Sequence, residues 1–112
     1  MIEKYEFGLI VIDDMEYRKD VLIIGNKIKN WYRIESHSVA IPDIEKLVKT
    51  KPQVIIIGTG ANGLMEVPEK TVKFILNRGI ELSTNTTDKA VEKFNAFLKE
   101  GIKVAAAFHI TC

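Results

Sequence analysis

Apolar and polar positions change their rhythm near residue 41, and this change divides the chain into two kinds of predicted structure. Before it, the apolar runs within 7–17 and 20–28 are interrupted by turn-prone residues, and the segment 31–39 alternates between apolar and polar side chains. Short runs and alternation of this kind are typical of strands. We therefore predict an antiparallel meander over about the first forty residues.

After residue 41 the pattern predicts helices alternating with strands. Apolar residues recur at helical spacing from about 42 to 51, 68 to 79 and 87 to 101, and the last two helices are followed by glycine. Strands are predicted at about 53–57, 80–84 and 103–109, and the first of them is continuously apolar. Strands joined by helical crossovers lie parallel in one sheet. The order predicts an α/β domain with three layers and a mixed sheet, with the meander packed beside the parallel strands or added to them.

Length and composition limit the domain organisation and the location. With 112 residues and 12.7 kDa, the chain is expected to form a single domain over residues 1–112. No apolar run approaches the ~20 residues that span a bilayer, and the first residues lack the pattern of a secretory signal. We therefore expect a cytoplasmic protein with no membrane partner.

Charge and cysteine content exclude several kinds of partner. The formal charge is +1 and the lysines are scattered along the chain, which gives no reason to expect a nucleic-acid partner. The single cysteine, Cys112, allows no internal disulfide and no zinc site built on several cysteines. The spacing of His37, His109 and Cys112 gives no support to a metal site, so no metal is predicted.

The stretch VIIIGTGANG at 54–63 has the glycine spacing of a dinucleotide-binding turn. Such a turn requires a helix that opens inside the motif and an acidic residue at the end of the following strand. Here the helix is predicted to begin only at Pro68, and Glu81 stands at the start of its strand. No Lys-Ser/Thr pair follows the glycines, which excludes a P-loop. We predict no cofactor, and we expect these glycines mainly to permit positive φ and close packing.

The predicted topology nevertheless brings three loops to one edge of the sheet. Ligands of parallel α/β sheets bind beyond the carboxyl ends of the strands, where glycine-loop amides and threonine hydroxyls can hold an anion. The candidate pocket combines the glycine loop 58–63, the loop 84–87 and the terminal segment 109–112, and its residues are Gly58, Thr59, Gly60, Gly63, Thr84, Thr86, Thr87 and His109. A small anionic ligand is the occupant that this chemistry favours.

Few other residues indicate chemistry. His109 and Cys112 could form a base and nucleophile pair, but a terminal cysteine is commonly mobile, so no catalytic residue is assigned. The role of Cys112 stays open. Trp31 and Tyr32 are expected to anchor either the core or a partner contact, and the core is favoured. Asn95 is expected to bond a loop.

Several motifs together resemble one small family along nearly the whole chain. They are FGLIVIDDMEYRKDVLII, Trp31 and His37, KPQVIIIGTG, the group Thr87, Ala90, Phe94 and Asn95, and EGIKVAAAFHITC. The chain is similar to a family of short archaeal and bacterial proteins of unknown function, which also includes a mitochondrial complex I assembly factor and the adipogenesis-associated domain-containing protein of animals. The resemblance implies a three-layer α/β domain and carries over no catalytic residue.

Three classes of function stay open at this point. The resemblance favours a non-enzymatic protein-interaction or assembly-factor-like domain, which binds a partner protein or associates with itself. The first alternative is a protein that binds a small molecule or anion through the three loops. The second is a small enzyme in which His109 or Cys112 acts.

Overall fold

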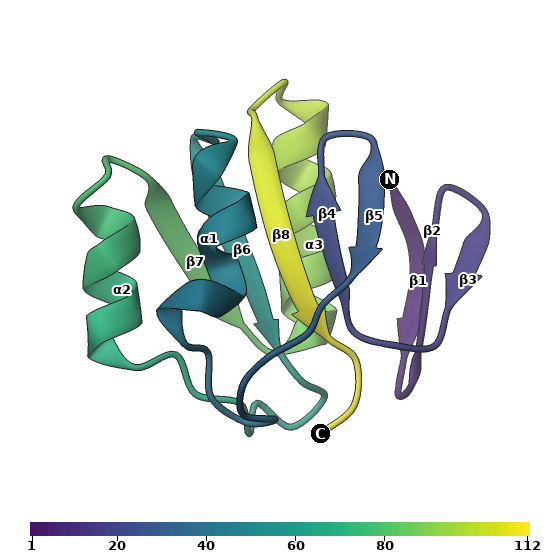
Figure 1. Cartoon of the computed structure of the whole chain (residues 1–112). Coiled ribbons are helices and arrows are strands. Elements are labelled where there is room, and N and C mark those ends of the chain that lie inside the picture. Colours follow the sequence, from purple (N-terminus) through teal and green to yellow (C-terminus); the bar gives the residue numbers. More distant parts are fainter.

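The computed structural model describes the whole chain, residues 1–112. Its elements follow in the order β1 (Ile2–Glu6), β2 (Leu9–Ile12), β3 (Met15–Tyr17), β4 (Val21–Ile24), β5 (Lys27–Asn30), α1 (Ile41–Lys49), β6 (Val54–Thr59), α2 (Glu69–Leu76), β7 (Glu81–Asn85), α3 (Thr87–Lys99) and β8 (Val104–His109). Three helices thus accompany two sheets (Figure 1). None of the helices is both long enough and apolar enough to cross a membrane.

The larger sheet is mixed, as the sequence predicts. Its five strands lie in the order β5-β4-β8-β6-β7, and β6 runs parallel to both β7 and β8. The hairpin of β4 and β5 joins β8 in antiparallel pairing. All three parallel strands fall within two residues of their predicted bounds. Strands β6 and β8 are buried apolar runs, whereas β7 is a more polar, partly exposed strand at the edge of the sheet.

One part of the N-terminal meander packs beside the larger sheet and the other part is added to it, so both predicted arrangements occur. Strands β1, β2 and β3 form a separate antiparallel sheet, whereas β4 and β5 extend the larger one. The strand predicted at 31–39 is wrong: this segment holds only isolated bridges, such as Ser38 to Glu66. Its backbone is instead bonded by the Asp43 carboxylate, which accepts from the amides of Ile34 and Ala40. Alternation alone did not distinguish a strand from an irregular segment tied down in this way.

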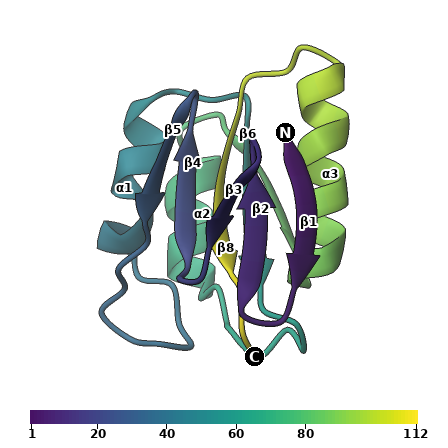
Figure 2. The same cartoon turned by 90° about the vertical axis from the view of Figure 1, so that its right-hand side faces the viewer.

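The larger sheet is the middle of three layers. Helices α1 and α2 cover one face, where Ile44, Leu47 and Ile75 pack against Ile55 and Ile57. Helix α3 and the small sheet cover the other (Figure 2). Trp31 is 4% exposed and packs in the core between the sheet and helices α1 and α2, as expected. Tyr32 is 76% exposed, so its predicted place in the core is wrong.

Asn95 attaches the small sheet to α3. Its side-chain oxygen accepts from the backbone amide of Ile2 at 2.9 Å, and its amide group donates to the carbonyl of the same residue at 2.8 Å. The partner is therefore strand β1 and not the expected loop. One side chain reproduces the pair of bonds that a neighbouring strand would make.

We expect Asn95→Ala to lower the free energy of unfolding by about 1–3 kcal/mol, since it leaves both backbone groups of Ile2 without their partner. Urea denaturation measures this change. The matched control is Asn77→Ala on the exposed end of α2, which we expect to change stability by less than about 0.5 kcal/mol. Equal effects of the two variants would contradict the attachment role of Asn95.

Candidate functional site

The carboxyl ends of β6, β7 and β8 meet at one end of the molecule, as the topology requires. The loops that follow them lie there beside the segment 31–40, the β1–β2 turn and the connection from β3 to β4 (Figures 1 and 2). The C-terminus lies among them. We call this assembly of loops the carboxyl end.

Two of the predicted glycines serve close packing. Gly58 lies in β6, where a Cβ would stand 2.9 Å from both the Phe108 ring and the Thr87 hydroxyl. Gly60 has φ +104°, and a Cβ there would stand 2.2 Å from the carbonyl carbon of Cys112. The glycine spacing that resembles a nucleotide motif thus permits the chain's last residues to lie directly on the loop.

The amides of the glycine loop are engaged by the chain itself. The Gly60 amide donates to the Thr87 hydroxyl at 2.9 Å, the Ala61 amide to the Thr111 carbonyl at 2.7 Å, and the Leu64 amide to a Cys112 oxygen at 3.3 Å. The Thr87 hydroxyl in turn donates to the His109 carbonyl at 2.6 Å. In this arrangement, an external anion would have to displace residues 111–112 to reach these donors.

The structure separates the predicted pocket residues into two groups. Gly58, Gly60, Thr87 and His109 are buried, and residues 111–112 lie directly on Gly60. The other four line an open hollow of about 610 Å³ between the glycine loop, α2 and β7, and they are Thr59, Gly63, Thr84 and Thr86. Two of the hydroxyls are occupied locally, Thr59 by the Asn85 carbonyl and Thr86 by the Asp88 carboxylate. Ligand binding by these residues stays a prediction.

The sequence patterns did not predict a buried charged cluster that lies at the same end of the molecule. The Asp20 Oδ2 lies 2.8 Å from Arg33 Nη1 and 2.8 Å from His109 Nδ1, and its Oδ1 accepts from the Ile110 amide at 2.8 Å. The side chains of Asp20, Arg33 and His109 are 16%, 7% and 6% exposed. Burial by itself would raise the pKa of Asp20, but the bonds from His109, Ile110 and Arg33 outweigh it and hold that pKa below its ordinary value.

The irregular segment after β5 positions Arg33 in this cluster. The Arg33 guanidinium stacks on the Trp31 ring, 4.5 Å from the ring centroid, and donates to the Ser36 carbonyl at 2.9 Å. The Trp31 indole N–H donates to the carbonyl of Asp43 at the start of α1. The planar guanidinium can therefore bind Asp20 and cover an aromatic face at once.

The cluster leaves a ring nitrogen without a partner. A bond from His109 Nδ1–H to Asp20 assigns the lone pair to Nε2, and this atom and Arg33 Nε are both buried without a hydrogen-bond partner. The exposed His37 ring lies edge-on to His109, with 5.8 Å between the centroids. A carboxylate that orients an imidazole is the arrangement of a general base. His109 lines none of the four main cavities.

The other residues weighed as chemical candidates in the sequence are His37 and Cys112. Cys112 is half-buried, with its backbone on the glycine loop. The structure gathers no three His, Cys, Asp or Glu side chains into a group that could hold a metal ion. The Cys112 and His109 side chains, considered as a nucleophile and base, form no hydrogen bond with each other, and His109 bonds Asp20 instead.

We expect Asp20→Asn to lower the free energy of unfolding by about 3 kcal/mol at neutral pH, because it leaves the buried Arg33 unpaired. The pKa of Asp20 is lower in the folded than in the unfolded chain. The ionised carboxylate therefore stabilises the fold fully above the unfolded pKa of about 3.9, and this contribution is lost as pH falls through the folded pKa. The difference between wild type and variant should narrow below about pH 4.

Urea denaturation at a series of pH values between about 7 and 3 measures this difference. The matched control is Asp14→Asn, at an exposed position whose carboxylate makes no bond. A gap between wild type and Asp20→Asn that stays constant down to the lowest pH would contradict the role assigned to the ionised carboxylate.

Comparisons with known proteins agree with this architecture. The family model described as "Protein of unknown function (DUF498/DUF598)" matches residues 2–109. The conserved hypothetical protein PH1505 from Pyrococcus horikoshii OT3 is 24% identical, with a TM-score of 0.90 over 100% of this chain and 99% of its own. The protein MT938 is 26% identical, with a TM-score of 0.87 over 100% and 98% of the two chains.

A further similar structure carries a different description. It is described as an outer membrane protein from Bartonella henselae, and it is 26% identical to this chain, with a TM-score of 0.85 over 99% of this chain and 94% of its own. These matches cover the small sheet, the larger sheet and the three helices together. The family match spans all but the first residue and the last three. The chain belongs to the DUF498/DUF598 family of proteins of unknown function.

Proposed function

We propose that this chain is a non-enzymatic protein-binding domain whose docking surface is the carboxyl end. The observation that carries the proposal is a group of large apolar side chains exposed on three of its loops. They are Phe7 (64% exposed), Tyr32 (76%), Ile34 (72%) and Leu64 (57%). Exposed apolar side chains that gather at one end of a small domain are typical of an interaction site.

These side chains stand on backbone that is already fixed. The Gly8 amide, next to Phe7, donates to the Ile110 carbonyl at 2.8 Å, and the Leu64 amide donates to Cys112. The backbone amide of Ile34 donates a hydrogen bond to the Asp43 carboxylate, and Ile34 directly follows Arg33 of the buried cluster. A partner would therefore not have to order these loops on binding, which reduces the entropic cost of association.

The occupant we propose is another protein with an apolar surface of its own. Aromatic and aliphatic anchors surrounded by charged positions such as Glu35 and Glu66 form the usual centre and rim of a protein interface. The family's resemblance to a mitochondrial assembly factor supports this class of function. A second copy of this chain is the competing occupant.

A photo-crosslinking amino acid at position 34 or 64, in cells of the natural host, should yield one discrete crosslinked protein. The same amino acid at position 76 is the control, because Leu76 is also exposed (51%) but lies on α2. The identified protein is then purified and titrated against the domain. We expect Ile34→Ser with Leu64→Ser to weaken its binding at least tenfold, and Leu76→Ser to leave it unchanged.

Three outcomes would contradict the proposal. Equal crosslinking from positions 34, 64 and 76 would mean that the loops have no special affinity. A crosslink only to a second copy of the chain would replace the partner by self-association. Reproducible turnover of a metabolite that His109→Ala abolishes would make the chain an enzyme.

The orphaned Nε2 of His109 favours a second candidate function, that of a small enzyme with His109 as general base. Asp20 orients the ring and fixes its tautomer, as in catalytic Asp–His pairs. Arg33 and His37 both lie against the His109 ring, so a substrate could reach the ring only if the segment that holds them moves.

Diethyl pyrocarbonate, which acylates accessible imidazole nitrogens, measures whether the segment opens. We expect rapid modification of the exposed His37 and protection of the buried His109, read by peptide mass spectrometry. Asp20→Asn, which loosens the cluster, should increase the modification of His109 and leave that of His37 unchanged. Modification of both histidines at similar rates in the wild type would favour the enzyme over the protein-binding domain.

A further inference from the structure

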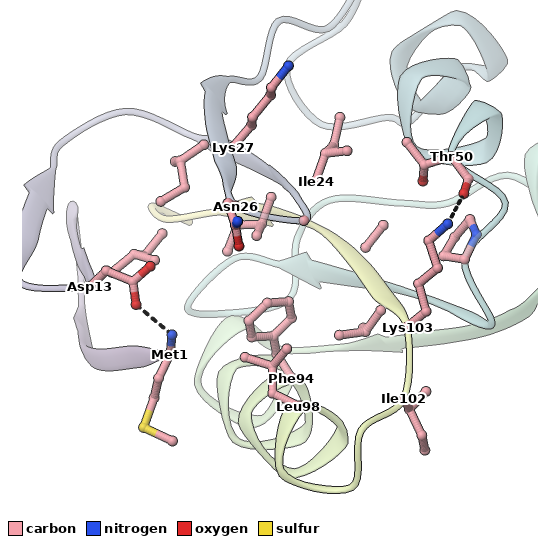
Figure 3. Close-up of a pocket in the computed structure, with 17 residues that line it drawn as sticks. Met1, Asp13, Ile24, Asn26, Lys27, Thr50, Phe94, Leu98, Ile102 and Lys103 are labelled. Carbon is pink, nitrogen blue, oxygen red and sulfur yellow. Dashed lines mark hydrogen bonds and ion pairs between the residues drawn. The ribbon is translucent and has the colours of Figure 1, made fainter.

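The end of the molecule opposite the carboxyl end holds a cavity of about 590 Å³. It opens where β8 begins, between the small sheet, the turn that joins β4 and β5, and the last turn of α3 (Figure 3). Its volume lies within the usual range for small-molecule sites. None of the residues predicted from the sequence as a pocket lines it.

The floor of the cavity is apolar. Phe94 and Leu98 belong to α3 and lie side by side there (Figure 3). Ile23 of β4 and Val104 of β8 also line the cavity. Phe94 and Ile23 are each 3% exposed and Val104 is 7% exposed, so they belong to the packed core, while Leu98 is 40% exposed. Leu98 therefore supplies exposed apolar surface at the cavity, and the other three are core residues that line it.

The rim of the cavity is cationic. Lys27, the first residue of β5, is exposed, and its ammonium points away from the cavity in Figure 3. Lys103 directly precedes β8, and its ammonium donates to the Thr50 carbonyl. An ammonium group has three donors, so Lys103 keeps two for another acceptor. Asp13 is the lining carboxylate, and it is already paired with the amino group of Met1 at 2.7 Å.

The position of Lys103 is fixed by its backbone. Its amide donates to the Gln53 side-chain oxygen at 2.9 Å, and its carbonyl accepts from the Gln53 amide at 2.8 Å. The charge therefore stands at a defined edge of the apolar floor. This combination is complementary to a molecule with an apolar body and one anionic head.

We propose that this cavity binds a small amphipathic carboxylate, an aliphatic or aromatic acid whose body lies on Leu98 beside Phe94 and whose carboxylate is bound by Lys103. Lys27 joins the carboxylate when its exposed side chain turns toward the cavity. The site is separate from the docking surface of the proposed function and does not depend on it. A neutral molecule of the same shape would gain the apolar contact alone. A cationic one would meet the charges of both lysines.

Octanoate, octanol and octylamine test this proposal as probes of equal chain length. In titrations followed by amide chemical shifts, octanoate should bind more tightly than octanol, octylamine should bind most weakly, and the shifts should centre on Asn26, Leu98 and Lys103. We expect Lys27→Met with Lys103→Met to weaken octanoate about fivefold and to leave octanol unchanged. Lys46→Met, an exposed lysine of α1, is the matched control.

A charge inversion on the floor gives an independent result. Leu98→Asp changes an exposed position of α3, and it should weaken octanoate and strengthen octylamine. A thermal melt of each variant confirms that it is folded. Absence of octanoate binding, equal affinity for octanoate and octanol, shifts centred elsewhere, or unchanged octanoate affinity in the double lysine variant would each overturn the proposal.

Discussion

The position of β8 between β4 and β6 is the constraint on which the rest of the structure depends. Paired on both edges and buried on both faces, this strand joins the N-terminal hairpin to the parallel half of the sheet. Three of its residues are alanines, and their small side chains let α1 and α3 approach the sheet closely. The residues that follow it are held in turn, since the carbonyl of Ile110 accepts from both Tyr5 and Gly8.

This strand also assembles the charged cluster. The antiparallel register places Val21 opposite Phe108, so the preceding Asp20 comes beside His109. A carboxylate taken out of water needs paired donors, and Arg33, His109 and the Ile110 amide supply them. The cluster thereby fastens the segment 31–40, which has no ladder of its own, to the end of the sheet. The exposed apolar side chains of that segment depend on this fastening for their fixed position.

Local patterns predicted most of the fold but little of the cluster. Four β-branched residues in a row at 54–57 identify a buried strand, and the Ala90 and Phe94 spacing identifies the inner face of α3, because both signals lie within one element. Asp20 and His109 are 89 positions apart, and they meet only through the pairing of β4 with β8. The alternation at 31–39 predicted a strand. The backbone there is bonded instead by Asp43, which lies outside the segment, so the pattern within the segment could not reveal it.

The two ends of the sheet differ in what they leave open. At the carboxyl end the last residues lie on the glycine loop, and their carbonyls use the amides that could have held an anion, so what remains for a partner is the apolar outer surface of the loops. At the other end, core residues and the exposed Leu98 line an apolar cavity, and two lysines stand at its rim. The two ends therefore offer different surfaces: the first favours a broad contact between proteins, and the second favours a small molecule with one charged head.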